Sequence, residues 1–186
     1  MELKMFSRPA EKKSQARSAR LTGLIPAVIY SQGKPGENIC IEAPVFTNFL
    51  AKLKRGRLPT VQFTLVDEKG AKRRALIKDV QYNIINYNVI HLDFQEIHAN
   101  EEINVKVPIE CTGVNECVGI NQGGVLRQVI RNVKVRCLPE KIPAAFELNV
   151  TNLELKQTKR LRDLTLPEGV RALADLKEVA VVIAKR

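Results

Sequence analysis

Both histidines of the chain lie in one short stretch, "VIHLDFQEIH", which covers residues 89–98. His91 and Asp93 are two residues apart, so on a β-strand their side chains would point to the same face. A His and an Asp held together can serve a hydrolase or a metal site, or can bind polar groups of RNA without any reaction. A strand is favoured, because Leu92 and Phe94 are apolar and have the opposite parity.

Catalysis and metal binding would each require partners that the sequence does not supply. A hydrolase commonly places its nucleophile in a Gly-x-Ser-x-Gly turn, and this chain has none. A metal site needs a third ligand, and His98 has the wrong strand parity relative to His91. We therefore expect no catalytic residue, no metal ligand and no cofactor. A small metal-dependent hydrolase that uses His91 and Asp93 is the alternative.

Two other features could carry chemistry, and neither matches a known pattern well. The stretch "GVNECVGINQGG" lacks the Lys and Ser or Thr of a phosphate-binding loop, so it predicts a flexible connection between strands. The four cysteines stand at positions 40, 111, 117 and 137, and no two form C-x-x-C. They are expected to be ordinary reduced cysteines.

The charge of the chain points to a polyanionic partner. Its 30 Lys and Arg exceed its 20 Asp and Glu, which gives a net charge of +10 over 186 residues. No apolar run approaches the roughly 20 residues of a membrane span, and the N-terminus lacks the apolar segment of a secretory signal. The charge fits either nucleic acid or an acidic membrane surface, and nucleic acid is favoured. We expect a cytoplasmic protein, with no membrane and no small-molecule substrate as its partner.

The first twenty residues carry six basic and two acidic side chains, without a periodic apolar pattern. They predict an unpacked arm or long loop. Arg8, Arg17 and Arg20 lie in this arm, and the planar guanidinium group matches the oxygens of a phosphate. The arm is expected to bind RNA.

The rest of the chain predicts two β-rich domains. In residues 1–97, short alternating segments such as "ICIEA" and "TVQFTLV" accompany one helical segment that begins near Pro44. They predict a small β-barrel with one or two short helices. In residues 98–186, segments such as "EEINVKVPIEC" and "EVAVVIAK" predict a second β-rich domain.

Two longer stretches resemble a known family. "RSARLTGLIPAVIYSQG" and "LIKDVQYNIINYNVIHLDF" are similar to the two signatures of bacterial large-subunit ribosomal protein L twenty-five. The remainder, including "VRCLPEKIPAAFELNVTNL", resembles the long form of that family, which is called the CTC or general-stress type. The order and spacing of these motifs cover nearly the whole chain.

The resemblance implies a function without catalysis. The family binds 5S rRNA through its N-terminal β-barrel, in the central protuberance of the large ribosomal subunit. Carried over to matching positions, its RNA-binding residues are Arg8, Arg17, Arg20, Tyr30, Gln81, His91 and Asp93. Ser31 departs from the family, which usually has Gly after the Tyr.

The C-terminal domain is then expected to contact neighbouring ribosomal proteins or other rRNA. The chain would be associated with the ribosome in the cytoplasm. A stress-response RNA-binding protein that works away from the ribosome is the second alternative.

Overall fold

The computed structural model describes residues 1–8, 13–31, 33 and 35–185. Most of its regular structure is β-strand, which confirms the predicted fold class. The chain divides into two compact units, Met1–Glu101 and Glu102–Arg186, which we call the N-terminal and C-terminal units. The division falls a little beyond the predicted one after Ile97. His98 Nε2 lies 3.1 Å from Ser31 Oγ, so the chain just after Ile97 still contacts the first unit.

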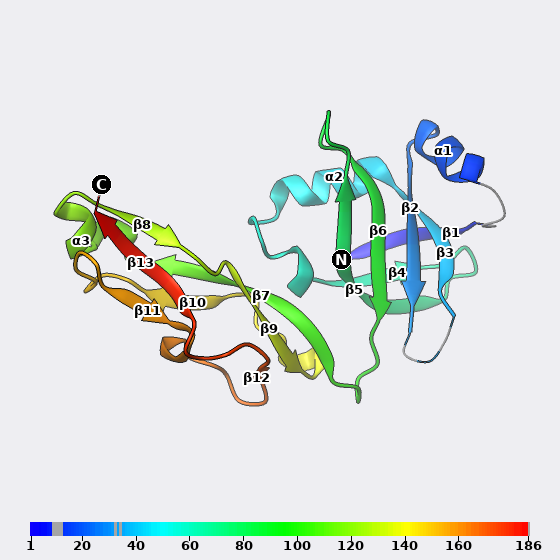
Figure 1. Cartoon of the computed structure of the whole chain (residues 1–186). Coiled ribbons are helices and arrows are strands. Elements are labelled where there is room, and N and C mark those ends of the chain that lie inside the picture. Colours follow the sequence, from blue (N-terminus) through cyan, green and yellow to red (C-terminus); the bar gives the residue numbers. More distant parts are fainter. Residues whose placement is uncertain (9–12, 32, 34, 186) are drawn as a thin grey trace. The chain divides into compact units, whose positions relative to one another are not determined.

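The N-terminal unit is a closed barrel of six strands (Figure 1). The strands are β1 (Glu2–Ser7), β2 (Leu24–Tyr30), β3 (Glu37–Glu42), β4 (Gln62–Val66), β5 (Lys72–Tyr82) and β6 (Val89–Glu96). They follow one another around the barrel in the order β1-β3-β2-β6-β5-β4. Parallel pairing of β1 with β4 closes the barrel, and the other parallel pair, β2 with β6, brings the two signature segments side by side.

Two helices and one 3-10 turn complete this unit: α1 (Lys13–Leu21), α2 (Ala43–Lys52) and η1 (Leu58–Thr60). Pro44 lies in the first turn of α2, where a missing N–H costs no hydrogen bond. The helix buries Phe46 completely in the barrel core. There the Phe46 ring approaches that of Phe63, whose edge also meets Phe94. The predicted helix is confirmed.

The prediction of an unpacked N-terminal arm is wrong. Leu3 and Met5 are buried on the inner side of β1, which pairs with β3 and β4. Only two buried apolar residues, Leu3 and Met5, alternate with polar ones in this strand. Both partner strands come later in the chain, so the local pattern was too short to predict a strand. Arg17 and Arg20 lie on a helix, α1, which packs beside β2 (Figure 1). Lys12, another basic residue of the predicted arm, lies outside the described residues.

The C-terminal unit contains two sheets. One has the strand order β10-β7-β9-β12, and the other has the order β11-β13-β8. These strands are β7 (Ile103–Thr112), β8 (Gly124–Gln128), β9 (Asn132–Cys137), β10 (Phe146–Asn149), β11 (Thr158–Arg160), β12 (Arg171–Ala172) and β13 (Val179–Lys185). The alternating β7 and β9 pair antiparallel, with Val105 opposite Val135 and Val107 opposite Val133, and all four side chains are buried.

The segment between β7 and β8 is not the flexible loop that its glycines predicted. It forms the 3-10 turn η2 (Val114–Glu116) and the short helix α3 (Val118–Asn121). Gly119 and Gly124 provide close packing: a Cβ atom on Gly124 would lie 2.6 Å from the carbonyl oxygen of Gly119. The glycines are therefore needed for contact between backbones rather than for mobility.

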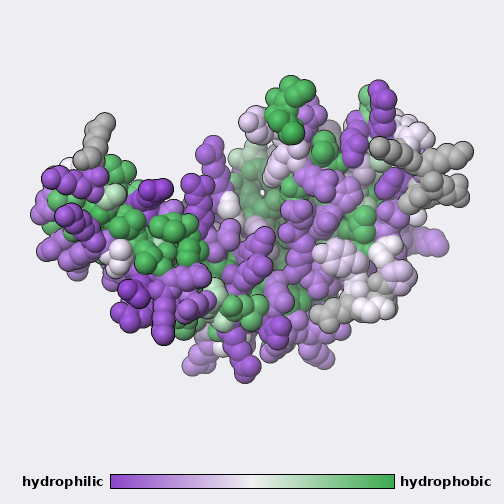
Figure 2. Space-filling model, viewed as in Figure 1, coloured by the Kyte–Doolittle hydropathy of each residue, from purple (hydrophilic) through white to green (hydrophobic). Residues whose placement is uncertain are grey.

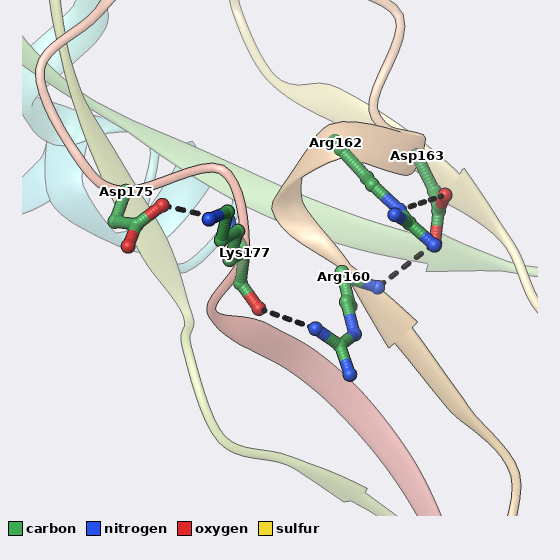
Figure 3. Close-up of polar contacts among 5 residues, drawn as sticks. All are labelled: Arg160, Arg162, Asp163, Asp175 and Lys177. Carbon is green, nitrogen blue, oxygen red and sulfur yellow. Dashed lines mark hydrogen bonds and ion pairs between the residues drawn. The ribbon is translucent and has the colours of Figure 1, made fainter.

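Two further 3-10 turns are η3 (Pro139–Lys141) and η4 (Leu161–Asp163). At η4, Asp163 Oδ2 accepts a hydrogen bond from the backbone N–H of Arg160 at 2.9 Å. The Arg160 guanidinium in turn donates to the carbonyl oxygen of Lys177 at 3.4 Å (Figure 3). This network joins the end of β11 to the loop that precedes β13.

Candidate nucleic-acid interface

The outer side of β6 carries the His91 and Asp93 pair. Leu92 and Phe94 point inward and are completely buried, which confirms the predicted strand parity. His91 Nδ1 lies 2.7 Å from Asp93 Oδ1, at 22% and 34% side-chain exposure. Nδ1 makes no aligned hydrogen bond in the described structure, so the two side chains are close without being hydrogen-bonded. Both side chains reach the surface, where a polar ligand could contact them.

The neighbouring strand β5 adds Gln81 and Asp79. Gln81 is the register partner of His91, and Asp79 is the partner of Asp93. Cross-strand partners have Cβ atoms about 5 Å apart, so the four side chains share one patch. Asp79 was missed in the sequence, although it has the same strand parity as Gln81 in the motif Lys-Asp-Val-Gln. That parity was the available signal.

Tyr30 approaches this patch from the other side, at the end of β2. In the parallel pairing of β2 with β6, Val28 lies opposite Asp93, and Tyr30 is two residues further on the same face. Partial burial raises the pKa of Tyr30, and the nearby carboxylates of Asp93 and Asp79 raise it further. The phenol therefore keeps its proton at neutral pH and can donate a hydrogen bond.

Helix α1 places two arginines next to β6. The Arg20 guanidinium Nε donates to the carbonyl oxygen of Ile90 at 3.0 Å, which fixes Arg20 beside His91. Arg17 lies one helical turn earlier and is exposed. Arg20 therefore borders the His91 and Asp93 patch, and Arg17 lies on a neighbouring part of the helix surface.

Arg8 lies at the far end of a row of paired residues. Its backbone N–H donates to the carbonyl oxygen of Asn38, Asn38 pairs with Val28, and Val28 pairs with Asp93. Three strand spacings, roughly 15 Å along the curved wall of the barrel, separate Arg8 from Asp93. Its Nε atom is buried and has no hydrogen-bond partner within the described part of the chain.

Arg20, Tyr30, Asp79, Gln81, His91 and Asp93 therefore lie on adjacent elements of the unit, a surface that we call the polar face. Arg8 does not join it, because β1 and β6 are three strands apart in the closed six-stranded barrel. The face combines a guanidinium cation with hydrogen-bond donors and acceptors, and it is built on paired strands. Such an array suits the irregular surface of folded RNA.

The second histidine has a different role. His98 Nε2 lies 3.1 Å from Ser31 Oγ, and Ser31 is the buried residue that replaces the usual Gly. The contact joins the end of β2 to the segment after β6. Among the described residues, no group of three or more His, Cys, Asp or Glu side chains could hold a metal ion. The same residues include no helix that is long and apolar enough to span a membrane.

Comparison with known proteins places this chain among the structural proteins of the ribosome. Residues 3–94 match the ribosomal L25p family, and residues 102–186 match the C-terminal domain of ribosomal protein TL5. Two relatives have the name "Large ribosomal subunit protein bL25". That of Chlamydia trachomatis serovar L2 (strain 434/Bu) is 47% identical and that of Chlamydia abortus is 46% identical, each over 186 residues and 100% of both chains. The chain belongs to the ribosomal L25p family, in its long form.

Family membership confirms the resemblance drawn from the two signatures. It also confirms a structural role in the large ribosomal subunit, in association with rRNA, and a chain that is not an enzyme. The metal-dependent hydrolase and the stress protein that works away from the ribosome are not supported.

Proposed function

We propose that the rRNA bound by the N-terminal unit is 5S rRNA, in the central protuberance of the large subunit. The observation that carries this proposal is the convergence of Arg20, Tyr30, Gln81, His91 and Asp93 on adjacent elements. These residues stand in the two signature stretches that resemble the 5S rRNA-binding family. The polar face consists of residues far apart in sequence, so it supports one common ligand rather than separate local roles.

The predicted RNA-binding residues are of two kinds, arginines and other polar side chains, which contribute differently to binding. The arginines neutralise phosphates, a contribution that is strong, salt-dependent and indifferent to sequence. The carboxylates, amide, phenol and imidazole contact base edges and 2′-hydroxyl groups, which distinguish one folded RNA from another. A-form RNA has a deep, narrow major groove, so the target of these side chains is an irregular internal loop with an accessible minor groove.

The C-terminal unit has a weaker electrostatic attraction for RNA. Residues 98–186 hold 14 Lys and Arg against 11 Asp and Glu, whereas residues 1–97 hold 16 against 9. We assign to it contacts with neighbouring ribosomal proteins or other rRNA. The chain would then be found with ribosomes in the cytoplasm.

A titration of the purified full chain with 5S rRNA tests this proposal. A folded RNA of the same length but unrelated sequence, at the same salt concentration, is the control, because it carries the same backbone charge. We expect 5S rRNA to bind at least about a hundredfold more tightly, a modest value for specific recognition of nucleic acid. Equal affinities for the two RNAs would contradict recognition of 5S rRNA and leave only electrostatic attraction.

A further inference from the structure

The hairpin that joins β5 to β6 ends in an unusually apolar tip. Ile84 and Ile85 are 89% and 91% exposed, and Tyr87 is 78% exposed. We call these three residues the hairpin knob. Figure 2 shows apolar surface protruding at the tip of this hairpin. Exposed aliphatic side chains are common singly, but adjacent ones on a projecting loop mark an interaction surface.

The knob is held in a defined shape. Asn83 and Asn88 close the loop through a backbone hydrogen bond of 2.8 Å, and the N–H of Tyr87 donates to the carbonyl oxygen of Asn83 at 2.9 Å. The side chains of Asn83 and Asn86 accept hydrogen bonds from the N–H groups of Ile85 and Asn88. A loop ordered before binding loses little entropy when a partner captures it.

A pocket of about 500 Å³, lined by both apolar and amide side chains, lies beside the knob. Amide side chains from α2 and the hairpin line it, together with Arg20 from α1; the amides belong to Asn48, Asn83, Asn86 and Asn88. Leu21, the residue after Arg20, is 81% exposed. Amides carry both a donor and an acceptor, as peptide groups do. An apolar knob next to a pocket that offers both apolar surface and amide groups therefore complements a polypeptide surface.

We propose that the hairpin knob docks into an apolar pocket on a neighbouring protein of the large subunit. The six residues from Asn83 to Asn88 carry no charge, although the unit around them is basic. Ile84 and Ile85 offer no hydrogen bond and no charge to a phosphate backbone, so a protein fits the knob better than RNA does. A second copy of this chain is disfavoured because each copy has a net charge of +10.

The knob lies next to the polar face, so a protein that contacts the knob would belong to the same ribosomal subunit as the bound rRNA. The pair Gln81 and His91 of the polar face is followed directly by Tyr82 opposite Val89, and then by the tip. When rRNA occupies the polar face, the hairpin extends beyond it. This inference rests on the proposed function, since rRNA on the polar face is what brings the knob to its neighbour.

Two variants of the full chain separate the apolar contact from other effects. Ile84→Asn with Ile85→Asn removes the aliphatic surface, whereas Ile84→Val with Ile85→Val retains it and serves as the matched control. Each is titrated onto purified large subunits from a strain that lacks this protein. We expect at least a tenfold weaker affinity for the Asn variant, which corresponds to about 1.4 kcal/mol, and near wild-type affinity for the Val variant.

Isolated 5S rRNA distinguishes this inference from the proposed function. Both variants should bind it like the wild type and melt at the same temperature, because Ile84 and Ile85 contribute no buried surface. Equal subunit affinity of the Asn variant and the wild type would overturn the role of the knob. Loss of wild-type binding to 5S rRNA would instead overturn the proposed function.

A photo-crosslinking amino acid at position 85 identifies what covers the knob. Irradiation of the full chain bound to the same purified subunits, followed by mass spectrometry, should yield an adduct with one ribosomal protein. Adducts only with rRNA, adducts only with a second copy of the chain, or no adduct would each contradict the proposal.

Discussion

Asp93 is surrounded by groups of different charge. His91 lies 2.7 Å away on the same strand, Asp79 is its partner on β5, and Tyr30 approaches from β2. A carboxylate pair on a surface that receives a polyanion would repel it. The carboxylates can, however, accept hydrogen bonds from amino groups and 2′-hydroxyls of RNA. Phosphates offer no such donors, so the two carboxylates favour an RNA that presents donors at this position.

His91→Ala and Asp93→Ala should each weaken binding to 5S rRNA by about 1–3 kcal/mol, the scale of a specific base contact. The double variant should lose less than the sum, since the two side chains are in contact and couple. Binding is measured by fluorescence titration, with an unrelated duplex RNA as the control that should change little. Wild-type affinity in both variants, with unchanged melting, would exclude the pair from RNA recognition.

The contribution of the arginines to RNA affinity should depend on salt concentration. Replacing Arg8, Arg17 and Arg20 by Ala should lower the slope of log affinity against log salt by roughly one unit per lost phosphate contact. A matched control replaces Lys52, Lys54 and Arg55, which are exposed and lie outside the polar face. A slope that changes equally in both triple variants would show that only net charge matters.

The sequence predicted five of the six members of the polar face but not how they are held. His91 and Asp93 follow from strand parity, because that rule needs only neighbouring residues. The anchoring of Arg20 on the carbonyl oxygen of Ile90 joins positions 70 residues apart, which no local pattern reveals. Asp79 was overlooked because a lone acidic residue on a basic domain has no obvious role until its register partner is known.

At the scale of elements, β1 shows why an arm was predicted where a strand exists. The strand is six residues long, and it pairs with β3 and β4, which begin at residues 37 and 62. Its stability comes from these distant partners. By contrast, the alternation in β7 and β9 and the Pro at the start of α2 are local signals, and these elements were predicted.

Met5→Ala tests whether β1 is packed. Met5 is 3% exposed, so truncation should lower the free energy of unfolding by about 2–5 kcal/mol, as at other core positions. Urea denaturation measures the change, with Lys4→Ala on the exposed side of the same strand as the control. An unpacked arm would give the same unfolding midpoint for both variants and the wild type.

Asp163→Ala tests the polar network at the end of β11. The carboxylate caps η4 by accepting from the N–H of Arg160, and loss of such a cap costs about 0.5–2 kcal/mol. Arg162→Ala is the control, because its exposed pairing with Asp163 at 3.8 Å should contribute little. Differential scanning calorimetry should show a lower melting temperature for Asp163→Ala alone; equal temperatures would show that the cap is not stabilising.

At the scale of the whole molecule, the sequence predicted two β-rich parts and their charge difference. Composition and strand patterns accumulate over many residues, so they were sufficient for this. The order of strands in the barrel and in the two sheets of the C-terminal unit was not predictable, because pairing depends on contacts between distant segments. Helix α3 and strand β8 were not predicted for the same reason: their glycine-rich sequence is typical of a loop, and their packing depends on distant segments.

Binding of 5S rRNA by residues 1–101 alone is the most direct test of the proposed function. The fragment ends where the first compact unit ends and contains every member of the polar face. Its dissociation constant and that of the full chain are measured side by side at one salt concentration, after circular dichroism has shown a folded barrel. We expect the two constants to agree within tenfold, about 1.4 kcal/mol. A folded fragment that binds more weakly than this would contradict recognition of 5S rRNA by the N-terminal unit.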